Sequence, residues 1–428
     1  MSTFPPLRIA IIGAGIAGLG TAIALQKHDG IDIQLYERST QLQELGASIA
    51  LGPNGMRKLE KLGIWRALQD DVAFRNPSGH PMVYRHWKTN EIVWVDDHQA
   101  EVEYRHRTAR FYRVHLHQAL QAHIDSSRIH LDKGFASLEQ RSDGVLVTFT
   151  DGSTTEADLV IGADGINSAV RRFFVPGSKP KWTGWVAFRS VFAAKAVEHI
   201  PGVLDEANHW WGPQRTFFAS RLGKDLFTIV GGWQGDPGTP GAFDKDTTWN
   251  SEGDVEVVKE LYRDWHPVIR QMVEASPYTR LYPNTYASSR ATWVHGSGNV
   301  TFVGDAAHAH GGAFAAGGSL ALDDGYALAL AILHVYPPGS TRKPSASTLR
   351  EALLLYEQTR KEHTDRVLEF VHRGNRQKVR DLHEEETDEQ LRHRMGNRVD
   401  VSWIHEHDVE SAFAQAIARS AGGFEARL

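Results

Sequence analysis

An α/β fold with an inserted antiparallel sheet is predicted by three patterns in the 428-residue sequence. The chain opens with an apolar strand, a glycine-rich turn and an apolar helix, which is the start of a βαβ unit. Short aromatic-rich strands then cluster between about 182 and 286, a spacing typical of an antiparallel sheet. An apolar strand and a glycine-rich loop return near Val300, so we expect the α/β frame to resume there.

Hydrophobic periodicity places the elements of the first half. Leu7 to Ile12 and Ile31 to Tyr36 are predicted strands, joined by a helix that ends near Gln26. Asp151-Gly152 is a strong hairpin signal between two further strands. The other elements predicted here are helices over 56–68 and 114–124 and strands over 145–149 and 154–161.

The second half divides into the insertion, the resumed frame and a C-terminal segment. The insertion is predicted to hold strands over 185–192, 216–221 and 226–231 and a helix near 255–274. The frame then continues with a strand over 300–303 and helices over 319–335 and 349–373, the last ended by Gly374. We expect a discontinuous first domain over 7–181 and 287–376, a substrate domain over 182–286, and a charged tail over 377–428 with a helix over 408–418.

The composition excludes several classes of function. The 41% hydrophobic content is enough for a sizeable core. The 47 Lys and Arg against 52 Asp and Glu give a net charge of −5, so no nucleic-acid partner is expected. The absence of cysteine excludes disulfides, thiolate nucleophiles and cysteine-ligated metals, and no other metal site is expected.

The location of the protein is predicted from two stretches. Ile9 to Leu25 is the most apolar stretch, but it is short for a membrane span and interrupted by glycines, so we expect no membrane segment or export signal. Ala426-Arg427-Leu428 is close to the Ser-Lys-Leu peroxisomal address. A cytoplasmic location is the first expectation, and peroxisomal import is the alternative.

The glycine-rich turn carries the first chemistry. Gly13-x-Gly15-x-x-Gly18 lies between a strand and a helix, and Glu37 ends the next strand. The glycines permit a tight turn and close approach of a pyrophosphate to the helix N-terminus, while the acid accepts hydrogen bonds from ribose hydroxyls. This pattern predicts a Rossmann-type dinucleotide site, and its spacing allows either NAD or FAD.

Two further motifs decide between these cofactors. They read ADLVIGADGINSAVR over 157–171 and GDAAHAHGGAFAAGGSLALDD over 304–324. With the first motif they resemble the class A flavoprotein monooxygenases, single-component FAD-dependent aromatic hydroxylases such as salicylate hydroxylase, over about 7–373. The resemblance implies a Rossmann-type FAD-binding domain, bound FAD, NAD(P)H as a transient co-substrate, O2 and a small aromatic substrate. The sequence is silent on oligomeric state.

The same resemblance assigns cofactor-binding residues. Arg38 stands beside Glu37, Arg113 matches an arginine that reaches the FAD, and Asp305 matches the carboxylate on its ribityl chain. Asp164 and Gly165 match a motif thought to serve both the FAD pyrophosphate and the nicotinamide donor. Arg113 as a surface residue and Asp164 as a turn cap are the structural alternatives.

The second glycine-rich loop is expected to stabilise the reduced flavin. Backbone N–H groups at a helix start can stabilise negative charge near flavin N1, and Gly317, Gly318 and Ser319 precede a predicted helix. The loop departs from most of the family, with Gly312 in place of a proline and Ala315-Ala316-Gly317 in place of Gly-Gln-Gly. In this it resembles fungal salicylate-hydroxylase-like enzymes of polyketide pathways, in secondary metabolism.

The expected reaction is hydroxylation of a phenolic, salicylate-like ring through a C4a-hydroperoxyflavin. A phenol is activated as its phenolate, so a cation or a proton acceptor should lie near the substrate oxygen. Arg189 and His310 are the catalytic candidates, and a structural salt bridge is the alternative role of Arg189. Oxidative dearomatisation of a phenolic polyketide, a non-hydroxylating NAD(P)H oxidase and a non-catalytic flavin-binding protein stay open as alternatives.

Overall fold

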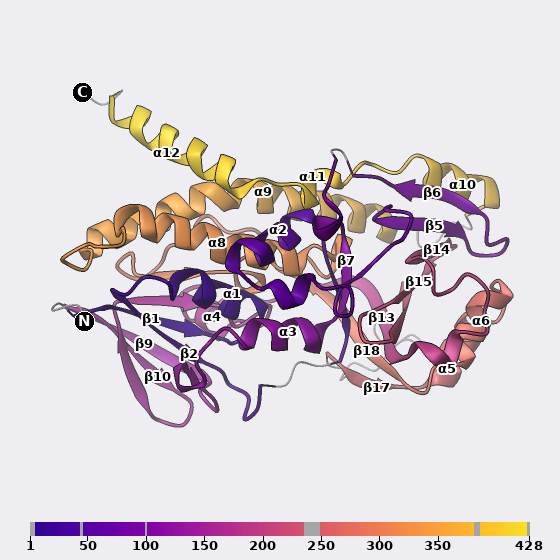
Figure 1. Ribbon diagram of the computed structural model, residues 1–428, viewed down its shortest axis with the longest axis horizontal. Helices are drawn as coiled ribbons and strands as arrows, with labels where there is room; N and C mark the ends of the chain where they lie inside the picture. Colours follow the sequence, from indigo (N-terminus) through magenta and orange to yellow (C-terminus); the bar gives the residue numbers. More distant parts are fainter. Residues whose placement is uncertain (1–4, 43–45, 99–100, 235–248, 381–385, 426–428) are drawn as a thin grey trace.

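A computed structural model describes residues 5–42, 46–98, 101–234, 249–380 and 386–425. A parallel sheet lies at one end of the long axis and a larger sheet at the other, and the C-terminal helices run along one side of both (Figure 1). The expected α/β class with an inserted antiparallel sheet is confirmed. Residues 426–428, with the predicted peroxisomal address, lie outside the described residues.

The parallel sheet forms the frame predicted from the N-terminal motif. Its strand order is β19-β12-β1-β2-β8, so β1 lies at the centre with β12 and β2 on either side. The helix α1 (Ile16–Leu25) joins β1 to β2 as expected. The five strands are β1 (Leu7–Ile12), β2 (Ile31–Tyr36), β8 (Ile129–His130), β12 (Leu159–Gly162) and β19 (Val300–Phe302).

The larger sheet is mostly antiparallel and has the order β17-β18-β13-β16-β15-β14-β5-β6. The domain boundaries stay a prediction, and two strands of this sheet, β5 and β6, come from before residue 182. Its members are β5 (Met82–His86), β6 (Ile92–Asp96), β13 (Lys181–Ala193), β14 (Asn208–Gly212), β15 (Arg215–Arg221), β16 (Leu226–Gln234), β17 (Ser251–Gly253) and β18 (Thr279–Tyr286).

Two three-stranded sheets complete the strands. One has the strand order β3 (Ser48–Leu51), β7 (Ala109–Tyr112) and β4 (Phe74–Arg75). The other contains the predicted hairpin and consists of β9 (Phe135–Arg141), β10 (Gly144–Phe149) and β11 (Thr154–Ala157).

Helices cover the sheets and form the C-terminal segment. The apolar helix α8 (Gly317–Val335) is long enough to cross a membrane, but 72% of it is buried inside the protein, where it packs on α1 and α9 (Ala346–Arg380). The others are α2 (Pro53–Leu62), α3 (Arg113–Gln121), α4 (Ala169–Phe174), α5 (Val255–Leu261), α6 (Pro267–Glu274), α7 (Asp305–His308), α10 (Asp388–Gly396), α11 (Ser402–His405) and α12 (Val409–Glu425).

Several predicted elements were wrong in their extent. The helix over 56–68 ends at Leu62, because Gly63 takes a left-handed φ of +83° and caps it. The strand over 154–161 breaks at Asp158, where the chain leaves β11 and enters the parallel sheet beside Arg8. The helix near 255–274 is two helices, since Pro267 starts a new one. The long helix α9 runs through Gly374 to Arg380.

Candidate functional site

The glycine-rich turn before α1 leaves one position open to a ligand. Gly13 has a φ of +108°, and a Cβ there would lie 2.5 Å from the carbonyl oxygen of Ala163. A Cβ at Gly18 would lie 2.0 Å from the carbonyl oxygen of Gly13, so packing alone requires both glycines. Gly15 caps α1 at an ordinary φ of −76°, and no heavy atom lies within 4 Å of the place of its Cβ. The space in front of the helix N-terminus is therefore free for an anion.

Glu37 is fixed beside this turn by two backbone donors. Its Oε2 accepts from the N–H of Ala14 at 3.0 Å, and its Oε1 accepts from the N–H of Ser39 at 3.0 Å. Arg38 follows it and is exposed. The carboxylate thus lies where the dinucleotide motif requires it, and the ribose and Arg38 roles stay predictions.

Asp305 begins α7 and is exposed, although Gly304 and Ala306 beside it are buried. Burial by the surrounding protein nevertheless raises the pKa of its carboxyl, partly opposed by nearby positive groups that include Arg113. The carboxylate is thus accessible, although the protein around it disfavours its charge. A polar ligand chain that offers hydroxyl donors fits such a carboxylate.

Asp164 and Gly165 follow β12 at the same edge of the parallel sheet. One oxygen of Asp164, Oδ2, accepts from the N–H groups of Ala169 at 2.6 Å and Val170 at 3.2 Å. The residue therefore caps the start of α4, in line with the turn-cap role expected as its structural alternative. The other oxygen, Oδ1, is buried without a hydrogen-bond partner, and burial raises the pKa of the carboxyl. Gly165 has a φ of +75° and no heavy atom near its Cβ position. The two residues leave an acceptor and open space for a ligand.

The start of α8 contributes one open glycine. A Cβ at Gly317 would meet only Asp305 Oδ1, at 3.9 Å. A Cβ at Gly318 would lie 2.8 Å from the side chains of Ile49 and Leu51, so close packing on β3 accounts for that glycine. The hydroxyl of Ser319 accepts from the N–H of Gly52 at 3.0 Å. Gly317 is therefore the residue of this group that faces Asp305.

A buried ion network that the sequence analysis missed holds α7 in place. Asp324 Oδ2 accepts from the N–H of Gly304 at 2.8 Å and is 2.5 Å from His308 Nε2. Asp324 Oδ1 accepts from Nε of Arg360 at 2.9 Å, and all these side chains are buried. The attraction of His308 and Arg360 outweighs burial and lowers the pKa of Asp324. The sequence signal for this network is the pair of acids, Asp323 and Asp324, that ends the motif over 304–324.

Two arginines hold the same turn from outside. Arg171 is completely buried and donates to the carbonyl oxygens of Asp305 at 3.3 Å and Ala306 at 3.1 Å. Arg290 donates to the carbonyl oxygens of Ala306, at 3.3 Å, and Ala307. Asp305 is thus positioned by its backbone, so its carboxylate stays available.

Arg189 projects from β13 toward the loop before α8. Its Cζ lies 4.9 Å from the ring centre of Tyr282 and 5.9 Å from that of Trp249, and a Cβ on Gly312 would lie 3.8 Å from its Nη2. Burial lowers the pKa of Arg189, and the charge of Arg113 lowers it further. No carboxylate forms an ion pair with Arg189 among the residues that the structure describes, so the predicted structural salt bridge is not seen there.

The second catalytic candidate, His310, is only 2% exposed. Burial lowers the pKa of its imidazole to about 3, so the ring is neutral at ordinary pH. Its ring centre lies 5.6 Å from that of His308, and its backbone bridges to Tyr286. His310 lies in the loop that runs from Asp305 to Gly312, the glycine near Arg189. Its buried ring does not reach the exposed side of this loop, and its catalytic role stays a prediction. Among the described residues, no three His, Asp or Glu side chains are grouped to hold a metal ion.

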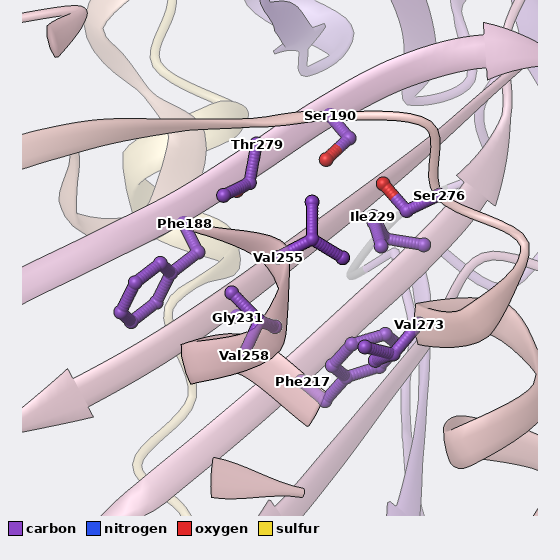
Figure 2. Close-up of a pocket in the computed structure, with 10 residues that line it drawn as sticks. All are labelled: Phe188, Ser190, Phe217, Ile229, Gly231, Val255, Val258, Val273, Ser276 and Thr279. Atoms are coloured by element: carbon purple, nitrogen blue, oxygen red, sulfur yellow. The ribbon is translucent and has the colours of Figure 1, made fainter. Parts of the chain in front are cut away.

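A small apolar pocket lies on the opposite face of the large sheet (Figure 2). Phe188 and Ser190 flank Arg189 in β13 and point to this other face, toward α5 and α6. Its hydroxyl groups bond within the protein, since Ser190 and Ser276 both donate to the carbonyl oxygen of Tyr278. The pocket offers no charge to a phenolic ligand and is a packing gap of the substrate sheet.

Comparison with known proteins identifies the family. A family model described as "FAD binding domain" matches residues 7–371. The chain belongs to this family. A 3-amino-4-hydroxybenzoate 2-monooxygenase of Streptomyces cremeus is 33% identical over 332 residues, 74% of this chain and 76% of that protein. A salicylate hydroxylase of Pseudomonas putida is 27% identical over 437 residues, 99% of this chain and 96% of that protein.

The fold of this FAD-binding family member is shared with solved structures. A structure titled "Salicylate hydroxylase substrate complex" has a TM-score of 0.77 and 22% identity, covering 96% of this chain and 98% of that one. The expected family and FAD as the cofactor are thereby confirmed, and the chain is an FAD-dependent monooxygenase.

The described residues fit FAD. The open position at Gly15, the free Oδ1 of Asp164 and the accessible Asp305 lie at the edge where β1, β12 and β19 end, which is where open α/β sheets bind ligands. These groups offer a helix N-terminus for phosphate and acceptors for hydroxyl donors. Gly317 lies beside Asp305, Arg113 is in electrostatic reach of it, and the two complete the set of groups that would hold the cofactor.

Proposed function

We propose that this enzyme hydroxylates a small phenolic ring that carries a carboxylate or another anionic group, with NAD(P)H and O2 as co-substrates. The observation that carries the proposal is the cation of Arg189, which no carboxylate of the described residues pairs and which faces the loop next to Asp305. A desolvated cation is costly to leave uncompensated, so the site favours an anionic ligand.

The names of the relatives support the same substrate class. One acts on 3-amino-4-hydroxybenzoate and the other on salicylate, both of which are hydroxylated aromatic carboxylates. In this chain the exposed Trp249 stands beside Arg189 and offers aromatic surface to a planar ring, while the buried Tyr282 packs against the guanidinium. An aromatic acid would place its charge on the guanidinium and its ring between Trp249 and the loop.

The residues of the chain have two tasks in this reaction. Bound FAD supplies the transfer of electrons from NAD(P)H and the activation of O2. Asp305, held by Asp324 and Arg171, orients the cofactor. Arg189 stabilises negative charge on the substrate, and so favours the phenolate over the phenol when the hydroxyl lies within its reach.

Oxidative dearomatisation of a phenolic polyketide needs the same cation and stays the second candidate. The loop facing Arg189 differs from most of the family at Gly312 and Ala315, and this difference supports dearomatisation as a candidate. A non-hydroxylating NAD(P)H oxidase is the third candidate and requires no anionic substrate.

The test is anaerobic stopped-flow reduction of the bound flavin by NADH and NADPH with matched ligands. Salicylate and salicylamide share ring and hydroxyl and differ in charge; orcinol aldehydes and acylphenols extend the panel. We expect an acid to accelerate reduction at least about tenfold and its amide to have little effect, because a charge-assisted hydrogen bond contributes about 1.5–3 kcal/mol. Arg189→Gln should remove the difference between acid and amide.

The matched control is Arg221→Gln on β15, whose guanidinium pairs with Asp225 on the surface. This variant should keep the preference for the acid. Turnover under O2 with product analysis by mass spectrometry separates a hydroxylated ring from a dearomatised one. Equal reduction with every ligand, and hydrogen peroxide in the amount of NAD(P)H consumed, would instead establish the oxidase.

A further inference from the structure

The loop that leads into α8 contains two non-glycine residues in the left-handed region. Phe314 has a φ of 56° and a ψ of 9°, and Ala315 has a φ of 52°. Side chains of L-residues disfavour this conformation, which glycine adopts easily. The two residues directly precede Ala316 and Gly317, and Gly317 is the glycine that faces Asp305. Surrounding contacts must therefore hold this loop in its observed shape.

The contacts come from a small apolar cluster that includes the C-terminal segment. Ile404, in α11, is completely buried together with Ala316 and Leu320 of the α8 start. Trp403 and Phe314 are partly buried and pack against the same cluster. The cluster consists of Ala316, Leu320, Val367, Val371 and Ile404, with Phe314, Val401 and Trp403 packed on it.

Trp403 is itself fixed on α9. The guanidinium carbon of Arg366 lies 4.0 Å from its ring centre, in a cation–π contact. Phe370 of α9 lies between Trp403 and Phe314. Its ring centre is 6.3 Å from that of Trp403 and 5.5 Å from that of Phe314. A continuous row of side chains thus links α11 to the left-handed loop.

The next residue of the segment anchors it to the other side of the loop. His405 packs so closely on Gly52 that a Cβ there would lie 2.6 Å from His405 Nδ1. The N–H of Gly52 donates in turn to Ser319, in the first turn of α8. Residues 401–405, which we term the strap, therefore contact the α8 start directly and through Gly52.

We propose that the strap positions the flavin-binding loop, with Trp403 and Ile404 as its positioning residues. Without their contacts, Phe314 and Ala315 would relax out of the left-handed region and move Gly317 away from Asp305. The strap lies beyond residues 7–371, which the family model matches. The proposal rests on FAD binding by the loop and is independent of which aromatic ring is the substrate.

The test uses the full chain with Trp403→Ala, Ala315→Gly and the double variant. FAD affinity is measured by titrating apoprotein into FAD and following flavin fluorescence, and the visible spectrum of bound flavin is recorded. We expect Trp403→Ala to weaken FAD binding about tenfold and to alter the flavin spectrum. The reason is that binding would then have to supply the energy that holds one residue in the left-handed region. Glycine at 315 needs no support, so the double variant should bind FAD within about threefold of Ala315→Gly alone.

The matched control is Phe413→Ala in α12. Phe413 also belongs to the C-terminal region and is partly buried, but it packs beside His334 at the far end of α8. This control should lower the melting temperature and leave FAD affinity and spectrum unchanged. If Trp403→Ala does not fold, Ile404→Ala with the same glycine rescue replaces it.

Two results would overturn the proposal. Wild-type FAD affinity and spectrum in the strap variants would show that the loop holds its shape alone. Equal weakening by Phe413→Ala, without rescue by glycine at 315, would show only general loss of packing. Neither result depends on substrate, so the proposed hydroxylation is tested separately.

Discussion

Asp305 and Arg189 are two side chains of the candidate site whose charges no other described residue pairs. Each is desolvated by its surroundings, yet neither makes an ion pair with another described residue. Buried charges are normally paired, because an isolated one is costly. The simplest explanation is that cofactor and substrate complete these two positions, with Arg113 in electrostatic reach of both.

Asp305→Asn should weaken FAD binding and leave the apoprotein at least as stable. The amide loses the charge-assisted acceptor, which contributes about 1.5–3 kcal/mol and corresponds to roughly 10–150-fold in affinity. The same change removes a desolvated carboxylate, so the melting temperature of the apoprotein should hold or rise. Fluorescence titration and thermal melts of the FAD-free protein measure the two effects, and a large loss of apoprotein stability would contradict the assignment.

Asp324→Asn should instead destabilise the apoprotein. The variant leaves Arg360 without one of its partners in a fully buried place, and breaking such a pair costs about 3–5 kcal/mol. Because the folded-state pKa of Asp324 is lowered, its ion pairs stabilise the protein above the ordinary Asp pKa and lose their effect as pH falls through the lowered value. Denaturant unfolding of the two proteins at neutral pH checks the size, and an unchanged midpoint would refute it.

At the scale of elements, the glycines separate into those that the fold needs and those that a ligand needs. Gly63 ends α2 in the left-handed region, at a φ of +83°. Gly15 begins α1 at a φ that any residue adopts, with open space around it. The two positions can therefore be tested by the same substitution.

Gly63→Ala should lower the stability of the apoprotein by about 1 kcal/mol and leave FAD binding unchanged. Gly15→Ala should do the reverse, because the methyl group enters only the space that a pyrophosphate would occupy. Chemical denaturation and FAD titration of both variants give the comparison. Tight FAD binding by Gly15→Ala would mean that the cofactor does not approach this turn.

Element ends were harder to predict than element types. The helix over 56–68 was predicted across Gly63 because its apolar spacing continues into a short 3₁₀ turn, Trp65–Leu68. The strand over 154–161 keeps its apolar pattern while passing from one sheet to another at Asp158. A glycine cap ends the helix and a tertiary contact of Asp158 with Arg8 ends the strand, and apolar periodicity predicts neither.

For the whole molecule, the sequence predicted the frame and the family but only part of the site. Gly15, Asp164 and Asp305 could be found because motifs fix their place after a strand. Asp324 is one of the paired acids in the motif over 304–324, but Arg171 and Arg360 could not be assigned their support of α7, because they act on backbone and buried charges far away in the chain. The strap carries no motif at all, and only three-dimensional packing shows what it touches.

Acid should loosen the C-terminal region through a stacked histidine pair. His363 of α9 and His407 have ring centres 3.9 Å apart, and burial lowers their pKa values to about 2 and about 3. Both rings are neutral when folded and take up protons on unfolding below the ordinary pKa of about 6.5, so they destabilise the protein as pH falls toward 4. His407→Asn should reduce the pH slope of unfolding free energy by about 1.4 kcal/mol per pH unit near pH 5.

Denaturant unfolding of wild type and His407→Asn between pH 7 and pH 4.5 measures this slope. His123→Asn, on the segment after α3, is the control and should leave the slope unchanged. Parallel slopes for wild type and His407→Asn would mean that the stacked pair already carries a proton in the folded protein.

The order of strands in the parallel sheet sets the timing of folding on the ribosome. The last strand, β19, lies against β12, and Val160 pairs with Val300, 140 residues later in the chain. Until those residues have been synthesised, the nascent chain displays β12 as an unpaired edge and cannot place Asp305 beside Asp164. Closing so long a loop is slow, and an open edge invites aggregation. Completion of the cofactor cradle must therefore wait for the substrate sheet, so both sites mature together late in translation.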